Sequence, residues 1–480
     1  MRTLQILAAL STIFAAGFGT FGLMVRDPRR FHIAEQFSIS WLCGAGVVSL
    51  SIWLFGLFLN HEALFVAVNV LCVALPLAAW KAGRSFGFRS PRRLNPFEWI
   101  LLLIVVGDVL IVGYLAFAHT LGWDGLLVWE IKARYAFENS GVLPNAYFQD
   151  AGRAFSHPEY PLAIPYAELW IYLWLGESTQ FWAKLIFPIF YLSGVILLVA
   201  ISARLTGKLW TGLVAAIVLS LIPQITVQPG SAVVGYADFP LSVFYLAACG
   251  YLLCATTSDH ADFLRIFAAC LACLPWLKRE GAILWVIAAG CGAFAIWHAK
   301  KSPKWFGILL PGLCVIVGWR IYLQQLQATT AADFAPVNFA TLSANIHRLV
   351  PILSALAAEL TNTDNWGLFW LIAAVAAVYV VRQYRDARSV IFVTAVTVPL
   401  TLYALIYLFS GWTDYQRHLE LSLCRLLMHI TPFACLGLPA VLASLASLRQ
   451  KFYRSPQETQ VRIATCEEPY PERTPEIDFA

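Results

Sequence analysis

FEWILLLIVVGDVLIVGYLAFAH, residues 97–119, leads into GWDGLLVWEIKARYAFENSGVLPNAYFQDAGRAFSHPEYPLAIPY, residues 122–166. The first segment is almost entirely apolar and is long enough to cross about 30 Å of hydrocarbon as an α-helix. The second is polar and rich in aromatic residues, in a chain that is otherwise almost continuously apolar. Membrane proteins expose charge in long loops where water or a substrate meets it, so the pair predicts a membrane helix followed by a functional loop.

Apolar segments of similar length recur along the whole chain. Of the 480 residues, 59% are hydrophobic and only 13% are charged, whereas a soluble protein carries about 25% charged residues. This composition predicts an all-α polytopic membrane protein with about 13 transmembrane helices. The expected helices are 4–25, 37–58, 62–80, 97–119, 181–203, 209–228, 237–256, 262–277, 282–299, 305–323, 364–381, 389–410 and 426–448.

The apolar segment 162–176 is expected to behave differently. It is short, it contains Pro165 and Glu168, and Pro161 precedes it. These features favour an interfacial or re-entrant segment over a full crossing. The large loop 120–180 is therefore expected to contain short amphipathic helices.

The basic residues predict which helix ends face the cytoplasm. With the N-terminus outside, 20 of the 33 Lys and Arg fall in turns on one side, as the positive-inside rule requires of cytoplasmic loops. A full crossing by 162–176 would place the later basic turns outside. We therefore expect one transmembrane domain over residues 1–454, with the external loop 120–180 carrying the active site. Residues 455–480 are expected to form a disordered cytoplasmic tail.

The net charge argues against a nucleic-acid partner, and the cysteine positions argue against disulfide bonds. The net charge of +5 comes from short turns beside helices, so it indicates contact with membrane lipids and not with nucleic acid. Ten of the 11 cysteines lie within or beside apolar segments, which is not the loop-borne pattern of a disulfide framework.

The first polar cluster follows the helix 97–119. Asp124 lies where that helix leaves the lipid, and a carboxylate there suits a general base that deprotonates an acceptor hydroxyl. Lys132 is a candidate phosphate contact, and Trp123 and Trp129 are candidate substrate-lining residues. An acid at a helix exit among interfacial tryptophans would have the same sequence, so the residues alone leave both interpretations open.

The second cluster is HPEYP, residues 157–161. Its two prolines fix the backbone around Glu159 and Tyr160, so a rigid turn and a ligand-binding turn are equally compatible with it. His157 and Glu159 carry groups that bind metals, but no HExxH or comparable ligand spacing accompanies them. We therefore expect no metal and no cofactor, with Glu159 as a cavity acid and His157 and Tyr160 lining the substrate site.

The third and fourth clusters each follow a turn between apolar helices. Asp238, in GYADFP, is the natural second carboxylate, since an acid at a helix mouth must face protein or water. Lys278, Arg279 and Glu280 are three consecutive charges in a short turn. An internal salt bridge and a phosphate-binding site both account for that turn.

The fifth cluster precedes the last apolar segment. Arg417 and Arg425 are two helical turns apart, so they are candidates to hold one phosphate together, and His418 is a candidate substrate-lining residue. No GxxxxGK[ST], GxGxxG or GxSxG motif accompanies these residues. An activated group is therefore expected on a lipid-linked donor and not on a nucleotide.

The order of these motifs resembles one known family. WD followed by W and KA, then HPEYP, GYAD with a following proline, the KREG turn and a late arginine segment are similar to bacterial GT-C membrane glycosyltransferases. The resemblance covers about residues 100–440 and is closest to family 39-like members, related to protein O-mannosyltransferases and the lipid A aminoarabinose transferase.

The resemblance implies inverting transfer of a sugar from a polyprenyl-phosphate donor to an acceptor in the cell envelope: a glycolipid, polysaccharide or protein. It places the chain in the bacterial inner membrane, with the site facing the periplasm, the N-terminus outside and the C-terminus inside. Asp124 matches the aspartate that the family uses as base, and Asp238 and Glu280 match acidic cavity positions. The donor-phosphate contacts, assigned by chemistry more than by alignment, are Lys132, Lys278, Arg279, Arg417 and Arg425.

Two departures from the family pattern affect these expectations. The first loop has one aspartate in the expected position and not the paired acids of some members, which weakens a metal-dependent mechanism. The short C-terminus is expected to lie inside, so we expect this chain to lack the periplasmic soluble domain of some family members. The alternative function is a multi-pass transporter or flippase of a lipid-linked or small polar substrate, although the polar residues cluster at one membrane face and not at helix centres.

Overall fold

The computed structural model describes residues 1–84, 93–258, 260–331 and 333–447, and within these ranges every regular element is a helix. A single bridge between Phe334 and Ser410 is the only strand-like pairing there. The expected tail 455–480 lies outside the described residues. The longer helices are α1 (Arg2–Met24), α2 (Ile33–Gly56), α3 (His61–Lys81), α4 (Pro96–Ala118), α9 (Ile186–Thr206), α10 (Leu209–Ser220), α12 (Asp238–Thr257), α13 (Ala261–Leu277), α14 (Arg279–His298), α15 (Leu310–Gln325), α17 (Leu349–Leu360), α19 (Phe369–Gln383), α20 (Ala387–Leu405) and α21 (Tyr415–Met428).

The expectation of an all-α polytopic membrane protein agrees with this architecture, but the count of 13 spans is not confirmed. In the described part of the chain, nine helices are long and apolar enough to cross a membrane, or ten if the bent pair Tyr415–Met428 and Thr431–Ser447 is one span. The three other expected spans, 209–228, 262–277 and 364–381, appear as the shorter helices α10, α13 and α19.

Proline and glycine account for the breaks that hydropathy does not reveal. α10 ends at Ser220 because Pro223 opens a separate short helix, α11 (Pro223–Thr226). α19 is preceded by Gly367, which has a φ of 55°, a conformation that favours glycine. The last apolar segment bends by 45° between α21 and the helix from Thr431, where Pro432 occupies the first turn.

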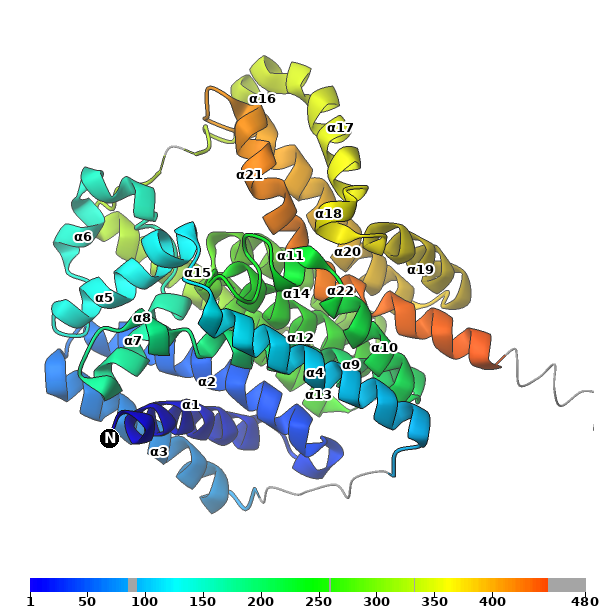
Figure 1. The fold of residues 1–480 in the computed structure, drawn as a ribbon, viewed down its shortest axis with the longest axis horizontal. Coiled ribbons are helices and arrows are strands. Elements are labelled where there is room, and N and C mark those ends of the chain that lie inside the picture. Colours follow the sequence, from blue (N-terminus) through cyan, green and yellow to red (C-terminus); the bar gives the residue numbers. More distant parts are fainter. Residues whose placement is uncertain (85–92, 259, 332, 448–480) are drawn as a thin grey trace, which may run out of the picture.

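α12 is the central helix of the bundle, and 89% of its most apolar window is buried inside the protein. α9, α13, α14 and α20 pack against it, while α4 packs on α9 and α10 (Figure 1). α3, α4 and α15 are much less buried and present apolar side chains outward, as expected of surfaces that face lipid. α1 and α2 cross closely, since a Cβ at Gly17 would lie 1.7 Å from the Ser40 carbonyl oxygen.

Contacts between turns define two ends of the bundle. At one end, Arg204 pairs with Glu35 at 2.6 Å, and Asp262 accepts a hydrogen bond from the Arg26 backbone at 3.0 Å. We call it the basic end, because these turns belong to the basic set of the sequence. From Arg204 at the basic end, the chain continues through α10 and reaches Asp238 at the opposite end. It then returns along α12 to the basic end. α10 and α13 therefore connect opposite ends although they are short.

The segment 162–176 forms α7 (Ala163–Leu175), and nearly all its side chains are buried. Its C-terminal neighbour Glu177 pairs with Arg2 at the start of α1, at 3.1 Å. Lys184, a few residues later, donates to the carbonyl of His119 just after α4 at 2.7 Å. Both contacts lie on the C-terminal side of α7, so that side is placed at the end of the bundle where α1 starts and α4 ends. The other short elements of this loop are a π-helical turn (Gly125–Glu130), α5 (Ile131–Glu138), α6 (Asn145–Gln149) and α8 (Gln180–Ala183).

Candidate functional site

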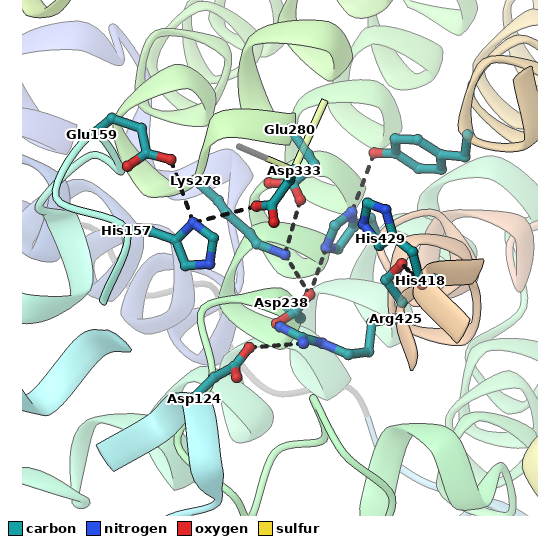
Figure 2. Close-up of polar contacts among 12 residues, drawn as sticks. Asp124, His157, Glu159, Asp238, Lys278, Glu280, Asp333, His418, Arg425 and His429 are labelled. Atoms are coloured by element: carbon teal, nitrogen blue, oxygen red, sulfur yellow. Dashed lines mark hydrogen bonds and ion pairs between the residues drawn. The ribbon is translucent and has the colours of Figure 1, made fainter. Parts of the chain in front are cut away.

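Asp238 is the centre of a buried charge network at the end of the bundle opposite the basic turns. Its side chain is 0% exposed. Lys278 Nζ donates to Oδ1 at 2.7 Å, Arg425 Nη2 donates to Oδ2 at 3.0 Å, and His429 Nε2 lies 3.0 Å from Oδ1 (Figure 2). A buried carboxylate is tolerated only with such partners, so Asp238 acts as the common acceptor for three side chains from other elements.

Arg425 joins the two carboxylates that the sequence singles out. Its Nη1 lies 2.7 Å from Asp124 Oδ2, while Nη2 contacts Asp238. The guanidinium also lies over the Tyr236 ring, 4.8 Å from its centroid, and the Tyr236 hydroxyl accepts a hydrogen bond from the Asp124 backbone N–H at 3.1 Å. Asp124 is 24% exposed and Asp238 is fully enclosed, so Asp124 is the more accessible acid for an incoming group.

The local structure explains why these residues meet. Asp238 occupies the first turn of α12, where the helix dipole favours a negative charge. Lys278 lies in extended backbone between α13 and α14 and directs its side chain back to Asp238. Arg425 and His429 are four residues apart at the end of α21, so they share one helix face.

The tautomer of His429 follows from its neighbours. An ionised carboxylate only accepts hydrogen bonds, so Nε2 carries the hydrogen that faces Asp238. Nδ1 lies 3.2 Å from the Tyr403 hydroxyl and, in a neutral imidazole, accepts a hydrogen bond from it. A neutral imidazole therefore satisfies both contacts and links Tyr403 to the carboxylate.

His157 and Glu159 form a second group beside this network. His157 Nδ1 lies 3.3 Å from Glu159 and 3.6 Å from Asp333, and its ring stacks on Tyr160 at 4.5 Å between centroids. His157 itself has a φ of 49°. Among the described residues, no three His, Cys, Asp or Glu side chains are arranged to hold a metal ion.

Lys132 contacts the turn formed by residues 157–161 through its buried side chain. Its side chain is buried, its Nζ donates to the His157 carbonyl at 2.7 Å, and it lies over the rings of Trp129 and Tyr160. Burial lowers the pKa of Lys132 to about 7, although the Glu159 carboxylate acts in the opposite direction. In this position the Lys132 ammonium group is bound to the His157 carbonyl. The expected contact of Lys132 with a donor phosphate stays a prediction.

Aromatic side chains connect the two groups to the start of α21. His418 is buried, stacks on Trp412 at 4.7 Å and lies 5.1 Å from the Phe334 ring. Arg279 is exposed, with its guanidinium 5.2 Å from the centroid of Phe334. Direct contacts thus link all five polar clusters of the sequence at one end of the bundle.

Two expected site residues lie apart from the network. Arg417 pairs with Glu420 at 3.2 Å, and both side chains are more than half exposed. Arg417 and Arg425 therefore do not converge on one group in this structure. Trp123 is 75% exposed, so its place beside a substrate stays a prediction.

Among the described residues, the buried polar atoms of this end that have no hydrogen-bond partner include Glu159 Oε2, Glu280 Oε2, Arg425 Nε and Trp129 Nε1. Glu280 is held through its other oxygen, 3.2 Å from Lys278. Buried unsatisfied atoms are costly. Charged side chains that keep such atoms can receive a polar ligand, as expected of a binding site.

Sequence reasoning missed His429, Asp333 and Tyr236 as members of the site. His429 lies inside an apolar segment four residues after Arg425, and an ionisable residue at such a place was an available signal. Asp333 lies in a loop between α15 and α16 (Phe339–Asn345). No sequence feature indicated its contact with His157, which joins residues that are far apart in the chain.

Glu168 on α7 is a buried acid outside this site, and it gives a pH-dependent prediction. Both carboxyl oxygens are buried and have no hydrogen-bond partner among the residues that the structure describes. Burial, together with the nearby Glu130 carboxylate, raises the pKa of Glu168 well above its usual range. The folded state therefore retains a proton that the unfolded state releases, so Glu168 lowers stability as pH rises above its unfolded pKa.

We expect Glu168→Gln to raise the unfolding temperature at neutral pH. The stability difference from wild type should grow by about 1.4 kcal/mol per pH unit above the unfolded pKa and level off above the folded pKa. Thermal unfolding between pH 5 and 8 measures this. Glu420→Gln, at an exposed position, is the control. Parallel wild-type and Glu168→Gln curves would show that the pKa is not raised.

The chain matches no protein family model, no curated protein and no solved structure.

Proposed function

We propose that this protein is an inverting glycosyltransferase that moves a sugar from a polyprenyl-phosphate donor to an envelope acceptor at the outer face of a bacterial inner membrane. The observation that carries the proposal is the pair of carboxylates, Asp124 and Asp238, bridged by Arg425 with Lys278 and His429 around them. The site lies at the end opposite the basic turns, which supports an outer position under the positive-inside rule.

The two carboxylates take different roles in this proposal. Asp238 is fully buried and bound by three donors, so it is a positioning residue for Lys278, Arg425 and His429. Asp124 is partly exposed and serves as the base. Fixing the cations before the reaction means that they need not reorganise as charge develops.

The reaction is a single displacement at the anomeric carbon. The acceptor oxygen forms a bond to that carbon, the bond from carbon to phosphate oxygen breaks, and the acceptor proton passes to Asp124. The leaving polyprenyl phosphate keeps the electron pair of the broken bond. Arg279 is exposed at the site, and Arg425 keeps its Nε without a partner, so these two side chains and Lys278 stabilise the leaving phosphate.

The lining residues divide by their contacts. Trp129, His157 and Tyr160 form a packed aromatic and imidazole group with Lys132. Trp129 is fully buried within it, whereas His157 and Tyr160 are partly exposed and offer their rings to a sugar. Glu159 and Glu280 each keep an unpartnered buried oxygen to accept sugar hydroxyls.

The test is transfer of labelled sugar from a panel of polyprenyl-phosphate donors to crude envelope acceptor by purified protein. We expect Asp124→Asn to lower transfer at least about 100-fold while donor binding is kept. Asp364→Asn, an exposed acid on α18 (Thr363–Trp366), is the matched control and should transfer normally.

Two other outcomes would contradict the proposal at different levels. Equal transfer by Asp124→Asn would remove Asp124 as the base while leaving the protein a transferase. No transfer from any donor, with uptake of a polar substrate into proteoliposomes, would favour the transporter or flippase instead.

A further inference from the structure

A cavity lies at the basic end, one full helix away from Asp238. Its volume is about 320 Å³, within the range of small-ligand sites. It lies where α12 ends, α14 ends and α20 begins, and its polar lining includes Thr256, Ser258, His298, Lys301, Asp386 and Arg388. Since α12 has 20 residues, the cavity is about 30 Å from the proposed active site.

The charges around the cavity are mostly positive. Lys301 and Arg388 line it, and Asp386 is the acidic residue of the lining. Asp386 pairs with Arg388 at 2.6 Å and also caps the first turn of α20. The flanking turns add Lys300, Lys304, Arg382 and Arg385. The positive-inside rule accounts for basic turns, but it does not require a cavity between them.

The surface beside the cavity is apolar. Trp297 on α14 is 72% exposed and Val390 on α20 is 48% exposed, and these two helices pack against each other. A ligand with a phosphate head and apolar chains would place both parts favourably, whereas a soluble phosphate would use only the cations. Basic pockets between membrane helices on the cytoplasmic side are suited to anionic headgroups.

We propose that this cavity binds the phosphate-bearing headgroup of an anionic glycerophospholipid, with the acyl chains along the apolar flank of α14 and α20. Lys301 and Arg388 contact the phosphate. The hydroxyl groups of the lining donate or accept hydrogen bonds at the polar end of the headgroup, and the Asp386 carboxylate accepts hydrogen bonds from it. This site is independent of the proposed transfer reaction.

The test measures retention of phosphatidylglycerol by the full chain, purified in mixed micelles and weighed by native mass spectrometry. The double variant Lys301→Gln/Arg388→Gln removes two lining cations and should weaken binding about 10- to 30-fold. Lys300→Gln/Lys304→Gln removes two cations from the same turn outside the lining and should stay within about threefold of wild type. Ala299→Phe fills the cavity without changing charge and should weaken binding at least about tenfold.

Three results would overturn the proposal. Equal losses in both double variants would show diffuse attraction by surface charge. Unchanged binding by Ala299→Phe would show that the cavity is not the site. Glycerol 3-phosphate bound as tightly as phosphatidylglycerol would show that the ligand is a soluble phosphate.

Discussion

Asp238→Ala is expected to destabilise the fold by about 3–5 kcal/mol, because it removes one partner of a buried ion network and leaves the others buried. Lys278 is only 4% exposed and His429 is 0% exposed, so water cannot replace the lost acceptor. Of its two carboxylate partners, Arg425 would retain only Asp124. Asp238→Asn keeps the size and one acceptor oxygen, so its loss should be smaller but of the same sign.

The measurement is thermal unfolding of the purified variants in one detergent, followed by size-exclusion chromatography. Glu420→Ala is the control, since it breaks a surface ion pair with Arg417 and should change stability by no more than about 0.5 kcal/mol. If Asp238→Ala unfolded like the control, the network would contribute nothing to folding. Lys278, Arg425 and His429 would then be positioned by their helices alone.

The helices of this protein follow from its sequence more directly than its site does. A membrane helix satisfies its own backbone, so length and apolarity predict α1, α2, α3, α4 and α12 closely. The breaks within 209–228, 364–381 and 426–448 depend on single residues. Hydropathy averaged over a window does not register them.

Only part of the network was predictable from the sequence, and its pairings were not. The positive-inside rule placed the polar clusters at one end, and the contacts of Asp124, Asp238 and Lys278 agree with that. The sequence left open whether Lys278 forms a salt bridge or binds an anion. The sequence predicted that Arg425 and Arg417 hold one phosphate together. In the structure Arg425 binds two carboxylates and Arg417 is exposed, because α21 directs Arg425 into the bundle and Arg417 outward.

Close packing of α13 against α14 gives the second large effect. A Cβ at Gly281 would lie 1.9 Å from the Leu274 carbonyl oxygen and 2.7 Å from its carbon. Both are backbone atoms, which cannot turn aside, so the two helices must separate. Gly281 directly follows Glu280 and lies three residues after Lys278, so the same separation moves the cation away from Asp238.

Gly281→Ala is therefore expected to destabilise the protein by at least about 3 kcal/mol, above the usual 1–3 kcal/mol for an overpacked core. Gly290→Ala lies on the same helix with nothing within 4 Å of the new Cβ. It should stabilise by up to about 1 kcal/mol, because alanine is the better helix former. Thermal unfolding of both variants compares the same chemical change with opposite expected signs. A stable Gly281→Ala would mean that α13 and α14 can separate without loss, and the position of Lys278 would then not depend on their contact.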